Sequence, residues 1–117
     1  KYENYYIKKK ISTRVVGVTY KNDDGNSRQD VIGGECFVKM RLKLEPFYFK
    51  GEPAIKVLTK DDLQIGFINK NLAAKIFNEV KSNKTLCIID ELLGGYNDTA
   101  KVGVKLKLMI LKDSLND

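Results

Sequence analysis

Lysine, arginine and aromatic side chains are the residues whose types and spacing in this chain favour a chemical role, and that role is binding. The 117 residues include 21 Lys and Arg against 15 Asp and Glu, a formal net charge of +6. Such an excess attracts polyanions but does not determine a fold. Phe47, Tyr48 and Phe49 are consecutive, so at least one ring must reach the surface or a pocket wall. Exposed rings beside cations are a common way to hold single-stranded nucleic acid.

Groups suited to catalysis are scarce. Histidine is absent, which removes imidazole ligands, Ser-His and Cys-His nucleophile systems, and any His general base. Cys36 and Cys87 each lie in an apolar, strand-like run, which predicts two buried thiols rather than a disulfide or a metal pair. The glycine pairs at 33–34 and 94–95 lack the residues of a phosphate-binding loop. We therefore expect no enzyme activity and no cofactor, and any hydrolase activity would belong to a larger parent or partner protein.

Neighbouring acidic residues are a further place where a metal could bind. They occur at Asp23–Asp24, Asp61–Asp62 and Asp90–Glu91. The first two pairs lie in predicted turns, where Asp serves the backbone. The third pair lies on a predicted strand, where successive side chains point to opposite faces. We predict no metal site, and a divalent-metal nuclease centre built from distant carboxylates is the less favoured alternative.

A helix start in the stretch DLQIGFINKNLA, Asp62 to Ala73, carries a lysine where the helix end is already positive. Asn69 is the predicted N-cap, and Lys70 follows it in the first turn. A cation there costs about 0.3–1 kcal/mol in isolation, but it becomes favourable if a phosphate or an acid binds at the helix start. The alternative is a lysine that extends into water. Phe67 and Asn71 flank this candidate anion site.

Two predicted strands carry basic residues on one face. Lys39, Arg41 and Lys43 alternate along one strand, and Lys105 and Lys107 along the last. If these strands are neighbours, five cations share a curved face that suits a nucleic-acid backbone. The alternative is an ordinary solvated outer face.

Short alternating runs, mostly joined by turns, predict a mainly β fold with minor α. The expected strands are 11–20, 35–46, 54–59, 63–68, 85–93 and 101–111, with a loop at 47–53. The expected helices are a main one from Asn69 to about Lys81 and a short one of a single turn, capped by Ser27 and ended by Gly33 and Gly34. This pattern favours a small six-stranded antiparallel barrel of OB-like or SH3-like type. We expect an N-terminal extension or edge strand at 1–12, one domain at 13–110 and a tail at 111–117.

Location and assembly are constrained only by absences. No apolar run approaches the ~18 residues of a membrane span, and no secretory signal is visible. We therefore expect a cytoplasmic protein that does not contact a membrane, with a monomer favoured. The chain begins at Lys1 rather than Met, which is compatible with a fragment of a longer protein.

Four segments together resemble one known family. TRVVGVTY, NDDGNSRQDVI, LEP followed by AIKV, and QIGFINKNLA, in this order and spacing, resemble a HIRAN domain over roughly Thr13 to Leu108. The resemblance implies an OB-like β-barrel with helices. It also implies an accessory module of SWI/SNF-type repair translocases or a small stand-alone bacterial protein. In the best-understood members of this family, the domain binds single-stranded DNA and captures a free 3′-hydroxyl end, which guides fork remodelling.

The resemblance implies roles for particular residues. Tyr20 corresponds to an aromatic that stacks on a base, and Lys70 to a lysine near the DNA backbone. Phe67 stands where DNA-binding members can have a histidine. The chain departs from the family after LEP, where FYFKGEPAI replaces an Asn-Pro-Tyr-Asp turn that helps to form the pocket for the terminal nucleotide.

We therefore predict an accessory module that binds single-stranded DNA or DNA ends by stacking and phosphate contacts, with a helicase or nuclease as a further partner. The alternative is a protein-interaction module that has lost the DNA-end pocket. The predicted binding residues are Tyr20, Phe47, Tyr48, Phe49, Lys50, Phe67, Lys70, Asn71 and Tyr96, with Lys39, Arg41, Lys43, Lys105 and Lys107 as weaker phosphate contacts.

Overall fold

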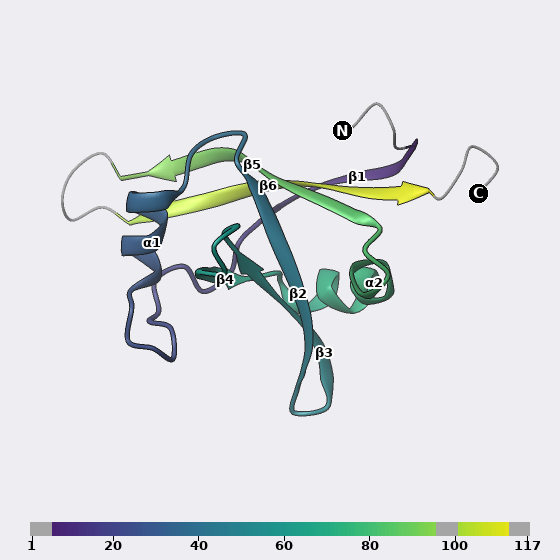
Figure 1. The fold of residues 1–117 in the computed structure, drawn as a ribbon, viewed down its shortest axis with the longest axis horizontal. Helices are drawn as coiled ribbons and strands as arrows, with labels where there is room; N and C mark the ends of the chain where they lie inside the picture. The colour runs from purple at the N-terminus through teal and green to yellow at the C-terminus, as the bar shows by residue number, and fades with distance from the viewer. Residues whose placement is uncertain (1–5, 96–100, 113–117) are drawn as a thin grey trace.

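Six antiparallel strands in one sheet and two helices make up the protein in this computed structural model, which describes residues 6–95 and 101–112 (Figure 1). The strand order is β1-β6-β5-β2-β3-β4. The predicted mainly β fold with one main and one short helix is confirmed. The elements are β1 (Tyr6–Arg14), α1 (Arg28–Glu35), β2 (Arg41–Phe49), β3 (Glu52–Leu58), β4 (Gln64–Phe67), α2 (Lys70–Lys81), β5 (Thr85–Gly94) and β6 (Val102–Lys112).

The sheet is barrel-like but is not closed by a continuous ladder. In the middle of the sheet, β2 pairs with β5 only through Arg41–Ile88 and Leu42–Cys87 in the described chain, and then runs away from it towards the β2–β3 hairpin (Figure 1). At the sheet's two ends, Val16 and Phe67 exchange backbone hydrogen bonds of 2.8 and 2.9 Å. This bridge brings the segment after β1 against β4, so the two halves of the sheet enclose one core.

Both helices begin where local capping signals predict. The Ser27 hydroxyl accepts a hydrogen bond from the Asp30 N–H at the start of α1. The Asn69 side chain does the same for Leu72 at the start of α2. The apolar face of α2 is buried against the sheet, and its buried residues are Ala73, Ile76, Phe77 and Val80.

Strand β2 lies later in the chain than the alternation predicts. The pattern favours a strand from residue 35, but α1 extends to Glu35 and Lys39 adopts a left-handed conformation (φ 76°) in the turn before Arg41. At its other end β2 includes residues 47–49, which the sequence predicts as a loop. Lys50 and Gly51 both have positive φ (51° and 81°), as a tight hairpin requires, so the strand pairing continues to the hairpin tip.

Strand β1 begins earlier than the β-branched run suggests. It pairs with β6 from Tyr6–Lys112 to Arg14–Lys105 and is an edge strand of the sheet. A register shift between Ile7 and Lys9 marks a bulge at Lys8. Residues 6–12 are therefore part of the same sheet as the rest of the described chain.

Candidate nucleic-acid interface

The β2–β3 hairpin and β4 gather aromatic rings on one face of the sheet. Phe47 and Phe49 alternate with Tyr48 along β2, so they share a face that Tyr48 does not. Lys56 of β3 pairs with Phe67 of β4 and shares that face, because cross-strand partners point to the same side. The Phe47 and Phe67 ring centroids are 6.0 Å apart at 39°, and the Lys56 ammonium lies 5.3 Å from the Phe47 centroid.

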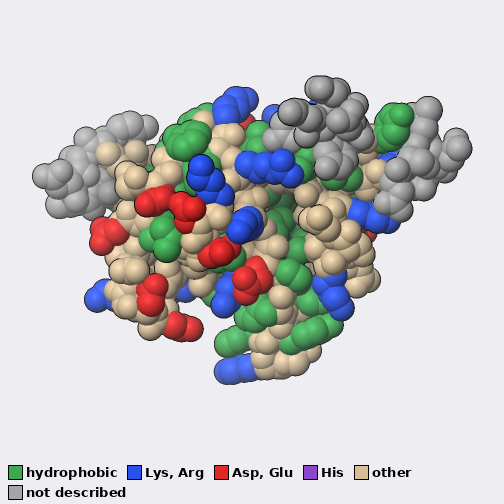
Figure 2. All heavy atoms as spheres, viewed as in Figure 1, with side chains coloured by type: hydrophobic (Ala, Val, Ile, Leu, Met, Phe, Trp, Pro, Cys, Tyr) green, Lys and Arg blue, Asp and Glu red, His purple; other side chains and the backbone are tan. Residues whose placement is uncertain are grey.

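These rings line an open pocket of about 500 Å³ between the hairpin and the start of α2. We call it the aromatic pocket. Five of the predicted binding residues line it: Phe47, Phe49, Lys50, Phe67 and Lys70. Phe49 is 59% exposed, while Phe47 and Phe67 are half-buried, so the rings present free surface. Hydrophobic side chains gather over the hairpin at the lower edge of Figure 2.

The start of α2 forms one side of this pocket and is held against β1. The Asn69 amide donates to the Thr13 hydroxyl (3.2 Å), while its carbonyl oxygen accepts from the Leu72 N–H (2.9 Å). Lys70 is exposed, and the first turn of α2, which the structure describes completely, contains no acidic residue. The positive helix end and the Lys70 ammonium therefore create a local preference for an anion beside the rings.

A buried arginine supports Phe67. The Arg28 side chain is 8% exposed, and its guanidinium carbon lies 5.0 Å from the Phe67 ring centroid. Its Nε donates to Asn22 Oδ1 (2.7 Å) and its Nη1 to the Gly17 carbonyl (2.9 Å). Burial lowers the pKa of Arg28 and nearby Asp23 raises it, but a guanidinium remains protonated in proteins. Sequence reasoning missed this residue, although an arginine directly after an N-cap opposes the helix dipole and was an available signal.

Gly66 fixes the position of Phe67. A Cβ at Gly66 would lie 2.4 Å from Val15 Cγ1 and from the Val16 carbonyl oxygen, and its φ is 156°. Only glycine allows β4 to approach the segment after β1 this closely. The glycine of the QIGF stretch therefore makes possible the bridge that carries Phe67.

The other predicted aromatic residues lie in different places. Tyr20 is 69% exposed, and a Cβ at Gly17 would lie 3.6 Å from its ring and 3.7 Å from the Phe67 ring, so Tyr20 is close to the aromatic pocket without lining it. Tyr48 is on the opposite face of β2, with its ring centroid 5.0 Å from that of Phe77. Asn71 is exposed in the first turn of α2, and Tyr96 lies outside the described residues.

The predicted basic stripe is not one surface. Strand β5 lies between β2 and β6, so the condition for five adjacent cations is not met. Arg41 and Lys107 do share a face, with Ile88 between them. Lys43 forms an exposed ion pair of 2.8 Å with Asp62. The two remaining residues also lie apart. Lys39 precedes β2, and Lys105 lies on β6 as the cross-strand neighbour of Glu91 on β5.

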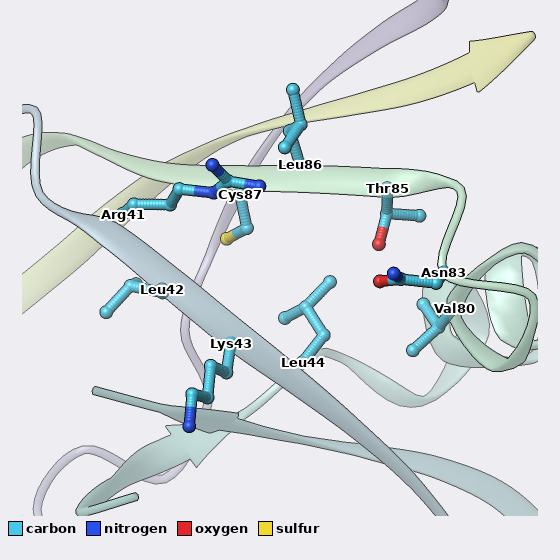
Figure 3. Close-up of a pocket in the computed structure, with 9 residues that line it drawn as sticks. All are labelled: Arg41, Leu42, Lys43, Leu44, Val80, Asn83, Thr85, Leu86 and Cys87. Atoms are coloured by element: carbon cyan, nitrogen blue, oxygen red, sulfur yellow. The ribbon is translucent and has the colours of Figure 1, made fainter. Parts of the chain in front are cut away.

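A second hollow of about 310 Å³ opens where β2 and β5 diverge (Figure 3). The polar ends of Asn83 and Thr85 point into it, as does the Cys87 sulfur. Burial raises the pKa of the Cys87 thiol to about 12, and burial, with Glu35, raises that of Cys36 to about 11. Both thiols are free and protonated at neutral pH. The prediction of two buried thiols is confirmed for Cys87, but Cys36 is half-buried because it lies at the C-terminal cap of α1 rather than in a strand.

The described part of the chain lacks two further features. No group of three or more Cys, Asp or Glu residues there could hold a metal ion. None of its helices is long and apolar enough to cross a membrane.

Comparison of the chain with models of protein families, with curated proteins and with solved structures found no match.

Proposed function

We propose that this protein binds single-stranded DNA as a non-catalytic module and places a base in the aromatic pocket. One observation carries the proposal: rings and lysines predicted separately from three parts of the sequence line the same pocket. Phe47, Phe49 and Lys50 come from the hairpin, Phe67 from β4 and Lys70 from α2. Aromatic rings and cations around an open cleft are what a sequence-tolerant single-strand site requires.

Size and energy agree with such a ligand. The volume of about 500 Å³ lies within the range of ~300–1,000 Å³ found for small-molecule sites. A base stacked on a ring contributes about 1–3 kcal/mol whatever its identity, because every base has a π face. In this proposal the phosphates on either side of that base contact Lys50 and Lys70, which are both exposed and line the pocket.

The resemblance to HIRAN domains supports the same class of ligand. The hairpin tip presents Phe49, Lys50 and Glu52 to the pocket in place of the Asn and Asp of the family's turn. We therefore propose recognition of stacked bases and phosphates rather than of a terminal 3′-hydroxyl.

Fluorescence anisotropy with labelled oligothymidine at several salt concentrations tests the proposal. If four to six phosphates are neutralised, the logarithm of the affinity should fall with that of the salt concentration with a slope of about −3 to −4. Lys70→Glu should weaken binding strongly, since it reverses the charge at the pocket. Oligonucleotides ending in a 3′-hydroxyl, a 3′-phosphate or a blocked end should bind alike. Binding that ignores salt, or that survives Lys70→Glu unchanged, would favour the protein-interaction alternative.

A further inference from the structure

A DNA strand longer than the aromatic pocket must leave it along the surface, and the charges of the described residues differ between two ways out. One way follows the outer face of β2. An open hollow of about 550 Å³, lined by Phe37, Lys39, Arg41 and Lys60 among others, lies at its far end. The basic residues along this way are Lys39, Arg41, Lys43, Lys56 and Lys60, and the acidic ones are Glu35, Glu45, Asp61 and Asp62.

The β2 side thus carries five basic and four acidic residues among those described, a net charge of only +1. Figure 2 shows acidic and basic side chains intermixed near the centre of the face that it displays. Lys43 and Asp62 already neutralise each other through their ion pair. A phosphate backbone would gain little from this surface, because four of its five cations are offset by nearby carboxylates.

The other way crosses the exposed side of α2. At about 100° per residue, Lys70, Ala74, Asn71 and Lys75 lie at about 0°, 40°, 100° and 140° around the helix. All four are exposed. They form a continuous strip from the aromatic pocket, which Lys70 lines, to a groove on the far side of the helix, which Lys75 lines.

This groove, of about 280 Å³, lies between β1 and α2. Lys8, Lys9 and Lys75 line it, and Glu79 is its single acidic residue among those described. We call it the β1–α2 groove. Its floor is apolar, with Ile11, Leu72, Ile76 and Ile110.

The bulge in β1 explains how two consecutive lysines enter the same groove. On a regular strand Lys8 and Lys9 would point to opposite faces. The register passes from Ile7–Leu111 directly to Lys9–Ile110, which leaves Lys8 without a cross-strand partner. A bulge of this kind redirects a side chain, and here both lysines line the groove.

We infer that the β1–α2 groove is a second contact zone for the phosphates of the same DNA strand, reached across Asn71 and Lys75. This inference rests on the proposed function and adds the direction in which the strand leaves the aromatic pocket. It also gives Asn71 a position under the bound strand, between the two zones.

A length series with two matched double variants tests it. Lys9→Gln with Lys75→Gln removes two cations from the groove, and Arg41→Gln with Lys60→Gln removes two from the β2 side. All four positions are exposed, so both proteins should fold, which circular dichroism and thermal unfolding would check. The probes are oligothymidines of about 3 and about 12 nucleotides, titrated at about 0.1 M salt.

Each phosphate contact to a single strand contributes about −0.7 to the slope of log affinity against log salt concentration. At 0.1 M salt this corresponds to about fivefold in affinity. The groove variant should therefore bind the longer oligonucleotide about 25-fold more weakly, with a salt slope reduced by about 1.4. Its affinity for the shorter one should change less than about twofold, as should the control variant's affinity for both.

The outcomes separate the two proposals. Failure of the unaltered protein to bind either oligonucleotide overturns the proposed function. Binding of the longer oligonucleotide that is unchanged in the groove variant, or weakened more in the control variant, overturns the second zone alone.

Discussion

Phe49 and Tyr48 provide a direct test of the aromatic pocket, because they are adjacent and similarly exposed but lie on opposite faces of β2. Phe49 lines the pocket and is 59% exposed. Tyr48 is 61% exposed and contacts the Phe77 ring on the other side. We expect Phe49→Ala to weaken DNA binding and Tyr48→Ala to leave it unchanged.

The size of the effect follows from stacking. Loss of one base–ring contact should cost about 1–3 kcal/mol, which is a five- to 150-fold rise in Kd. The free energy of unfolding should fall more in Tyr48→Ala than in Phe49→Ala. Tyr48→Ala loses an aromatic pair worth about 0.5–1.5 kcal/mol, whereas Phe49 has mainly solvent and the Lys50 ammonium, 5.4 Å from its centroid, beside it.

Anisotropy titrations with oligothymidine and urea unfolding of the same two variants would measure both quantities. The variant that loses more stability should bind normally, so a general loss of structure could not imitate the result. Equal losses of affinity in both variants, or a normal affinity for Phe49→Ala, would refute the assignment of the pocket.

Three further predictions concern the framework around this pocket. Gly66→Ala should lower the free energy of unfolding by about 2–6 kcal/mol, because the new Cβ would lie 2.4 Å from the Val16 carbonyl oxygen. Gly25→Ala is the control, because Gly25 also has a positive φ but has open space around it, and it should cost about 1–2 kcal/mol. Urea unfolding of both variants measures the difference. Arg28→Met should cost about 1–3 kcal/mol in the same assay, because it leaves Asn22 Oδ1 without its donor and the Gly17 carbonyl with the Tyr20 N–H alone. An unchanged stability would contradict the hydrogen bonds described here. Burial raises the pKa of Cys87 from 9.0 to about 12, so its stabilising contribution should be complete below pH 9 and be lost between pH 9 and 12. Urea unfolding across that range should show a steeper loss in the unaltered protein than in Cys87→Ala.

Local signals predicted the starts of both helices and the end of α2, whereas α1 continues through Gly33 and Gly34 to Glu35. Asn69 and Ser27 accept the hydrogen bonds expected of N-caps, and α2 ends at Lys81 as its apolar spacing indicates. Helix caps and helical spacing depend on residues that are close together along the chain, so they can be recognised in the sequence. The predicted start of β2 was wrong because the local pattern was misleading there. The alternation of apolar and polar residues continues through residues that form the end of α1 and a left-handed turn at Lys39.

The binding face was predicted only in part. The rings at 47–49 were identified, but not which of them share a face with Phe67, because that depends on the register of β2, β3 and β4. Arg28 was missed because its partners, Asn22 and the Gly17 carbonyl, come together only in the folded chain.

The sequence by itself determined the mainly β class, the two helix starts, the cationic balance and the presence of more rings than one core can bury. Tertiary structure alone decided that β5 separates β2 from β6, that Phe67 lies beside Phe47, and that a bulge turns Lys8 and Lys9 into one groove. The physical reason is that a period of two specifies which face a side chain occupies, whereas the neighbour across the sheet is chosen by the packing of distant segments around a shared core.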